Sequence, residues 1–223
     1  MHLTIIAKTP EPGRVKTRLC PPCTEAQAAE IAAAALADTI EAVDSTVADP
    51  RWRDRVQRVV LLDGQPGEWI PHRYDLVAQR GDGLGERLAN GFDDLGPGVI
   101  VGMDTPTAGR WLGEALGAVS AGRDVLGLAV DGGYWVIGLA ATDRAIFERI
   151  PMSQPHTGIA QLRRLHDLRR PVRLLPMTRD LDDVADLRAN ARSGAPGRLA
   201  AAARSIVDRL GEPLAPPRHA RCE

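Results

Sequence analysis

The 223-residue sequence predicts an α/β fold with a mostly parallel sheet. Short apolar runs such as LTII and GVIVG alternate along the chain with longer stretches of helical periodicity. Apolar residues make up 44% of the chain and charged residues 26%, which suits a soluble protein with one good core. We therefore expect one domain over residues 1–210, followed by a flexible C-terminal tail over residues 211–223.

The first half of the chain predicts three strands and two helices. The apolar run 2–7 is expected to form a buried strand. The alanine-rich stretch 24–43 has high helix propensity and predicts a long helix with Thr24 as its N-cap. Further strands are expected at 56–63 and 74–79, and a helix at 83–95.

The second half begins with the strongly apolar run 98–104, which predicts a strand. A helix is expected over 105–119, with Thr105 as N-cap and Pro106 at the first helical position. Two apolar runs flank the turn residues DGG and predict a hairpin of strands at 124–130 and 134–140. Helices are also expected at 141–150, 156–168 and 181–192, and a late strand at 171–177.

Charge and cysteine content narrow the function classes. Lys plus Arg number 28 and Asp plus Glu number 29, so the chain lacks the basic excess of a nucleic-acid-binding protein. No uncharged apolar stretch approaches the ~20 residues that span a bilayer, so we expect no membrane partner. Three cysteines without an export signal predict a cytoplasmic, reduced protein. Cys20 and Cys23 have the spacing of a zinc or redox pair, but no second ligand pair exists, so we interpret them as incidental.

A basic loop, AKTPEPGRVKTRL (7–19), follows the first strand. It matches neither the phosphate-binding P-loop pattern nor the glycine pattern of dinucleotide-binding folds. Gly13 permits close backbone approach, and Lys16 and Arg18 can neutralise phosphate oxygens. The alternative interpretation is a solvated surface loop. Because the net charge of the whole chain is −1, this local concentration of positive charge predicts a small anionic ligand.

Aspartates that follow strands are further candidates, because ligands of parallel sheets lie at the carboxyl ends of the strands. Asp63 follows the second strand, and Asp104 follows the run GVIVGM. Beside a pyrophosphate, Asp104 would suit Mg²⁺ or Mn²⁺, although a strand-end turn residue is the alternative. Asp131, Gly132 and Gly133 predict either a tight hairpin turn or a backbone approach to a ligand, and both roles are compatible.

Four ordered motifs resemble the signature of a bacterial glycosyltransferase-like family, domain of unknown function 2064. These motifs are AKTPEPGRVKTRL (7–19), VGMDTP (101–106), DGGYWVIGL (131–139) and DLDDVADL (180–187), and GDGLGERL (81–88) is similar to a fifth. Two departures concern the acceptor side. Asp183 stands where the family usually has threonine, and residues 151–158 lack a tryptophan that often follows the proline.

The resemblance implies a Rossmann-like three-layer sandwich of the glycosyltransferase A type, within the nucleotide-diphospho-sugar transferase superfamily. It implies a metal-dependent transferase that uses an activated nucleotide, first of all a glycosyltransferase-like enzyme with a nucleotide-sugar donor. One alternative is a nucleotidylyltransferase, similar to the phospholactate guanylyltransferases, that releases pyrophosphate. Another is a catalytically silent nucleotide-binding protein. Base, sugar, acceptor and oligomeric state stay open.

The resemblance also implies roles for individual residues. The acceptor site would use Asp131, Gly132 and Gly133. The metal, Mg²⁺ or Mn²⁺, would be held by Asp104 with Asp182 or Asp180 as a second ligand; the alternative role of this aspartate is to cap the following helix. The catalytic residues would be Lys16, Arg18 and Asp104, and the nucleotide-binding residues would be Ala7, Lys8, Pro12, Gly13, Lys16, Arg18, Asp63 and Gly85.

Overall fold

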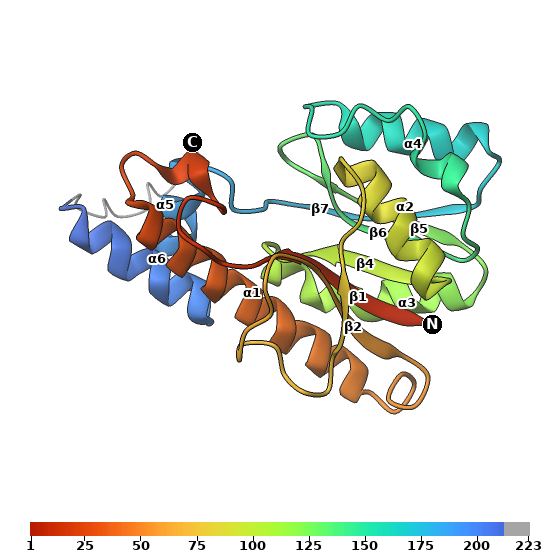
Figure 1. Ribbon diagram of the computed structural model, residues 1–223, viewed down its shortest axis with the longest axis horizontal. Helices are drawn as coiled ribbons and strands as arrows, with labels where there is room; N and C mark the ends of the chain where they lie inside the picture. Colours follow the sequence, from red (N-terminus) through yellow and green to blue (C-terminus); the bar gives the residue numbers. More distant parts are fainter. Residues whose placement is uncertain (212–223) are drawn as a thin grey trace, which may run out of the picture. The chain divides into compact units, whose positions relative to one another are not determined.

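The computed structural model describes residues 1–211, leaving aside the side chains of residues 106–108. Its strands are β1 (His2–Lys8), β2 (Gln57–Asp63), β3 (Asp75–Ala78), β4 (Gly98–Gly102), β5 (Asp124–Ala129), β6 (Tyr134–Leu139) and β7 (Val172–Thr178). They form one sheet in the order β3-β2-β1-β4-β6-β5-β7 (Figure 1). Only β6 runs antiparallel to its neighbours, β4 and β5. The predicted α/β fold with a mostly parallel sheet is confirmed.

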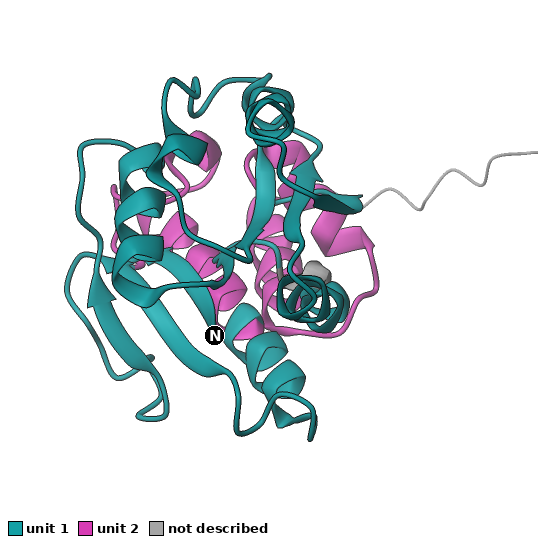
Figure 2. Cartoon of the chain, turned by 90° about the vertical axis from the view of Figure 1, so that its right-hand side faces the viewer, with its two compact units in different colours: residues 1–9, 39–180 teal, residues 10–38, 181–223 magenta. Residues whose placement is uncertain are grey.

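The described chain clusters into two compact units (Figure 2). The first unit comprises Met1–Thr9 and Thr39–Asp180 and holds all seven strands. The second comprises Pro10–Asp38 and the chain from Leu181 onward. The single domain predicted for residues 1–210 stays a prediction, and the tail predicted for 211–223 lies outside the described residues from 212 onward.

The first unit is built around a two-sided sheet. Its strands read as continuous apolar runs because helices can cover both faces of a parallel sheet. One core cluster joins strand residues such as Ile100 and Leu126 to Phe92 of α2 (Leu84–Leu95) and Leu165 of α4 (Thr157–Asp167). Strands β5 and β6 pair antiparallel, which confirms the predicted hairpin.

Two predicted helices of the first unit differ from the structure. The helix expected at 105–119 begins as the 3₁₀ helix η2 (Pro106–Trp111) and becomes α3 (Leu112–Ser120) only afterwards. Thr105 makes no capping hydrogen bond, and its buried hydroxyl has no partner among the described residues. The helix expected at 141–150 is reduced to η3 (Arg144–Phe147), because Glu148 already has extended backbone.

The second unit is helical. It contains the 3₁₀ turn η1 (Thr17–Leu19), the first part of α1 (Glu25–Ala48), α5 (Val184–Arg192) and α6 (Arg198–Arg209). Thr24 caps α1 as predicted: its Oγ1 accepts from the Gln27 backbone N–H at 3.2 Å, and the Gln27 side chain accepts from the Thr24 N–H at 2.8 Å. No described helix is long and apolar enough to cross a bilayer.

Helix α6 and the cysteines complete the core of this unit. The sequence analysis did not predict α6, although Leu199, Ala203 and Ile206 have helical spacing and are buried. Cys20 and Cys23 carry free thiols, and Cys23 lies in the same core. Burial raises the pKa of the Cys23 thiol, and the neighbouring Cys20 raises it further by a smaller amount. The higher pKa disfavours the reactive thiolate form.

A buried histidine at the start of β1 should make stability fall in acid. His2 is fully buried, with Nε2 donating to the Gly96 carbonyl at 3.0 Å and Nδ1 accepting from the Thr4 hydroxyl at 2.7 Å. Burial lowers the His2 pKa from 6.5 to about 4. The unfolded chain therefore binds the proton first, and the free energy of unfolding should fall by about 2 kcal/mol between pH 7 and pH 5.

Urea titrations at the two pH values test this expectation. His2→Gln should have a lower free energy of unfolding than the wild type at pH 7. Between pH 7 and pH 5, however, its free energy of unfolding should fall much less than that of the wild type. His72→Gln, which removes an exposed histidine, should keep the full pH dependence. An equal fall between pH 7 and pH 5 in His2→Gln and the wild type would show that other groups carry the effect.

Candidate functional site

The basic loop is anchored in the second unit by its apolar residues. Val15 and Leu19 are buried, whereas Pro12 and Gly13 are exposed. Gly13 has φ +77°, and a Cβ there would lie 3.3 Å from Glu25 Oε2 at the start of α1. Glycine therefore avoids both the strain of a positive φ and a close contact with the Glu25 carboxylate at this position. The anchored apolar residues hold the loop while its charged side chains stay near the surface.

Lys16 and Arg18 converge on a single carboxylate. Lys16 Nζ lies 3.2 Å from one oxygen of Asp182, and Arg18 Nη1 lies 3.2 Å from the other. The Lys16 side chain is only 10% exposed, whereas that of Arg18 is 72% exposed and that of Asp182 29%. The structure thus brings together three residues that were predicted for different roles, two for phosphate and one for metal.

Asp182 is held in place by the cap of α5. Asp186 Oδ2 accepts from the backbone N–H groups of Asp182 at 3.0 Å and Asp183 at 3.1 Å. Asp183 Oδ1 in turn accepts from the Asp186 N–H at 2.9 Å, which completes a capping box. The alternative role of Asp182 as helix cap is therefore wrong, since Asp183 is the N-cap. Aspartate at 183 supplies the capping oxygen that a threonine would also offer.

In the first unit, Asp63 at the end of β2 is paired rather than open. Its Oδ2 lies 2.7 Å from Arg87 Nη1, and the same nitrogen donates to Gln79 Oε1 at 3.2 Å. Gln79 Nε2 donates to the carbonyl of Ala7 at 2.7 Å. Sequence reasoning missed Gln79 and Arg87, although Arg87 belongs to the GDGLGERL motif that was singled out. These contacts tie the ends of β1 and β2 to the start of α2.

The remaining nucleotide-side candidates of the first unit lie at three separate places. Asp104 follows β4, is half-buried, and places Oδ1 3.1 Å from where a Cβ of Gly102 would be. Lys8 is exposed at the end of β1, and its backbone N–H points at Met103 Sδ at 3.3 Å. Gly85 is buried on α2, where a Cβ would lie 3.2 Å from Met152 Cε. Their proposed roles in binding stay predictions.

The DGG segment forms the predicted hairpin turn. Asp131 Oδ1 accepts from the Gly133 N–H at 2.8 Å, and the Gly132 N–H donates to the Ala129 carbonyl at 3.1 Å. Gly132 has φ +92°, and its carbonyl accepts from the Gly158 N–H at 2.8 Å. The turn is thereby fixed to the start of α4. Its role in acceptor binding stays a prediction.

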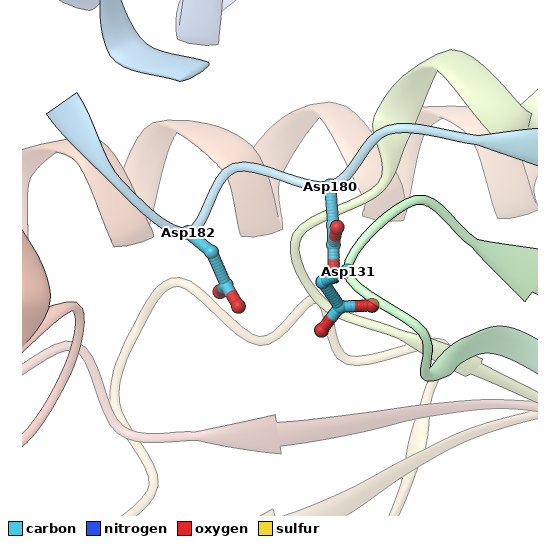
Figure 3. A group of neighbouring side chains, drawn as sticks. All are labelled: Asp131, Asp180 and Asp182. Carbon is cyan, nitrogen blue, oxygen red and sulfur yellow. The ribbon is translucent and has the colours of Figure 1, made fainter. Parts of the chain in front are cut away.

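A carboxylate pair lies beside this turn. Asp131 and Asp180, both in the first unit, place carboxylate oxygens within 4.8 Å of each other (Figure 3). The figure also labels Asp182, which is two residues further along the chain from Asp180 and belongs to the second unit. Sequence reasoning assigned Asp131 to the acceptor and named Asp180, which begins the DLDDVADL motif, as the alternative to Asp182 for the second metal ligand. Carboxylate oxygens of this kind suit Mg²⁺ or Mn²⁺.

Comparison with known families decides the relationship. The family of uncharacterised proteins conserved in bacteria, domain of unknown function 2064, matches residues 28–154, more than half of the chain. The chain belongs to this family. No curated protein matches the chain.

Two solved structures share the fold of this chain. A protein from Desulfovibrio desulfuricans G20, provisionally assigned as a nucleotide-diphospho-sugar transferase, is 23% identical over 94% of this chain and 95% of its own, with a TM-score of 0.78. A cytidylyltransferase from Leptospira borgpetersenii is 12% identical over 94% of both chains, with a TM-score of 0.51. The likeness confirms the predicted sandwich.

Proposed function

We propose that this member of the family is a metal-dependent transferase that binds an activated nucleotide, with glycosyl transfer from a nucleotide-sugar as its leading reaction. The observation that carries the proposal is the convergence of Lys16 and Arg18 on Asp182. Two cations held at one point of an anchored loop form a preorganised binding position for phosphate oxygens. The exposed Arg18 can turn from the carboxylate toward a ligand, because an exposed ion pair contributes little stability.

The charge of this trio favours a nucleotide-sugar. The formal charges of Lys16, Arg18 and Asp182 sum to a single positive charge. A diphosphate ester carries less negative charge than a triphosphate, so it needs fewer cations from the protein. Nucleotidylyl transfer is the second candidate. It is favoured by the presence of two cations on one loop and by the fold shared with the Leptospira cytidylyltransferase.

Two carboxylates of the first unit suit a hard divalent cation. Asp131 and Asp180 lie close together and offer carboxylate oxygens, the ligands that Mg²⁺ and Mn²⁺ prefer; Asp104 is not part of this group. We propose Asp104 as a metal ligand because its motif follows β4 at the carboxyl end of the strand. Asp182 as a second ligand stays a prediction. Bound metal would supply charge neutralisation to the ligand that it contacts.

A product assay tests the proposed reaction. Incubated with nucleotide-sugars or nucleoside triphosphates, Mg²⁺ or Mn²⁺ and a metabolite extract as acceptor source, the protein should release nucleoside diphosphate or monophosphate from a nucleotide-sugar. Pyrophosphate release from a triphosphate would support nucleotidylyl transfer instead. Absence of turnover with every donor, despite binding, would support the silent nucleotide-binding alternative.

Nucleotide titrations with and without Mg²⁺ or Mn²⁺ test the metal site. Asp104→Asn keeps the shape of the side chain but removes the charge that a hard cation requires, so nucleotide affinity should no longer respond to Mg²⁺ or Mn²⁺. Asp54→Asn is the matched control, since Asp54 is an exposed aspartate of the same unit. A wild-type metal response in Asp104→Asn would remove this residue from the proposed site.

A further inference from the structure

A cavity of the first unit lies at the start of α2. It has a volume of about 490 Å³, within the range of small-molecule sites. It is lined by the start of α2 and by residues 144–152, which include η3 and the loop after it. Leu84, Phe147, Ile150 and Met152 contribute apolar side chains to its wall, and polar groups contribute a comparable share. The apolar body of a ligand would pack against the apolar part of this wall.

Three of the four charged side chains that line this cavity are already engaged. Glu148 and Arg144 form ion pairs with side chains outside the lining. The carboxylate of Glu86 accepts from the backbone N–H of Asp82 at 3.1 Å. The exposed Arg149 lines the same cavity, and no acidic side chain of the described chain pairs with its guanidinium. Arg149 is thus a cation available to a ligand.

The backbone conformation of Arg149 also favours a ligand-binding role for this residue. Its φ is +59°, in the left-handed region that glycine or asparagine adopts at lower cost. Unusual backbone of this kind clusters at ligand sites, where the surroundings impose it. Here the conformation follows η3, whose Ile146 and Phe147 are buried, so the packed 3₁₀ turn fixes where the arginine begins.

The start of α2 adds a second feature that favours an anion. Gly83 is the N-cap and makes no side-chain capping bond, and it lines the cavity together with Gly85. The first backbone N–H groups of a helix lack partners within the helix and carry partial positive charge. Gly85 leaves the wall open, since a Cβ there would lie 3.2 Å from Met152 Cε.

We propose that this cavity binds an amphipathic organic anion, with an apolar body against Phe147 and Met152 and a carboxylate, sulfonate or phosphate at Arg149. The apolar wall accounts for the body, and Arg149 together with the start of α2 accounts for the charge. The proposal uses none of the loop cations or strand-end aspartates; the cavity wall does include Gly85, one of the nucleotide-binding candidates.

Two fluorescent probes test the site directly. 8-Anilinonaphthalene-1-sulfonate carries an aromatic body and a sulfonate, and N-phenyl-1-naphthylamine has the same body without charge. The wild type should bind the sulfonate probe at one molecule per chain. Arg149→Asn should weaken this probe by about 10-fold or more, because a charge-assisted hydrogen bond is lost, and should change the neutral probe by less than about twofold.

The variant and its control keep the outcome decisive. Asparagine suits the left-handed backbone, so Arg149→Asn should melt at or above the wild-type temperature. Arg123→Gln removes the same charge from an exposed position of the same unit that does not line the cavity, and should bind both probes like the wild type. Equal loss of the sulfonate probe in both variants, equal loss of both probes in Arg149→Asn, or clearly lower melting of Arg149→Asn would overturn the proposal.

Discussion

Replacing Lys16 and Arg18 together with alanine should weaken binding of the preferred nucleotide-sugar by about 100-fold or more. Each side chain would lose a charge-assisted hydrogen bond to phosphate, and such bonds contribute about 1.5–3 kcal/mol. The free energy of unfolding should fall by less than the binding free energy, because Arg18 is 72% exposed and Asp182 can be solvated after the pair is removed; the remaining fall comes from lost packing of the Lys16 side chain, which is only 10% exposed. Calorimetric titration and thermal melts of the same samples measure both quantities.

The other arginine of the loop, Arg14, provides the control. Arg14 pairs with Glu11 at 3.0 Å and is 51% exposed, so Arg14→Ala removes a cation from the same loop without touching the pair at Asp182. It should change nucleotide affinity by only a few fold through long-range charge. Affinity within a few fold of the wild type in the double variant would contradict the phosphate role. An equal loss of nucleotide affinity in Arg14→Ala would mean that the loop attracts the nucleotide only through its overall positive charge.

The sequence predicted the strands well because their signal is local. Each buried strand is a short apolar run bounded by polar residues, and β4, whose residues 98–101 are all buried, is the clearest example. The predicted strand ends also indicated where candidate residues lie. Asp63, Asp104 and Asp131 are each within a few residues of a strand end. Local pattern was enough to say where a site should be sought.

The pairing of candidate residues could not be predicted, because it depends on contacts between distant parts of the chain. Lys16 and Asp182 are 166 residues apart, and nothing in either local pattern indicates that they meet. Asp63 and Arg87 are only 24 residues apart, yet their ion pair depends on how α2 begins after β3. Sequence reasoning therefore selected candidate residues but treated as open several groups that the fold pairs.

The helix boundaries failed for a different reason. At 141–150 the composition favours a helix, but the two large apolar residues of η3, Ile146 and Phe147, are adjacent and both buried. Both lie inside the short 3₁₀ turn, and the chain leaves the helix directly after them, where Glu148 has extended backbone. The resulting left-handed Arg149 belongs to the cavity proposed above and has no local sequence signal.

Replacing Gly132 with alanine should destabilise the protein by about 3 kcal/mol or more, a large share of the ~5–15 kcal/mol that a domain has. A Cβ at this position would lie 1.8 Å from the carbonyl oxygen of Pro155, so backbone must move. The movement would also break the 2.8 Å hydrogen bond from the Gly158 N–H to the Gly132 carbonyl. Chemical denaturation of the two proteins measures the difference.

Gly122→Ala separates the backbone strain of this change from the steric clash. Gly122 has φ +77°, but a Cβ there would meet nothing within 4 Å, so its substitution should cost only about 1 kcal/mol. The difference between the two variants then reports how tightly the DGG turn is packed against residues 155–158. A cost for Gly132→Ala no greater than that for Gly122→Ala would mean that this segment yields easily. In that case the turn would be free to adapt to an acceptor, and the glycines would be explained by ligand approach rather than by packing.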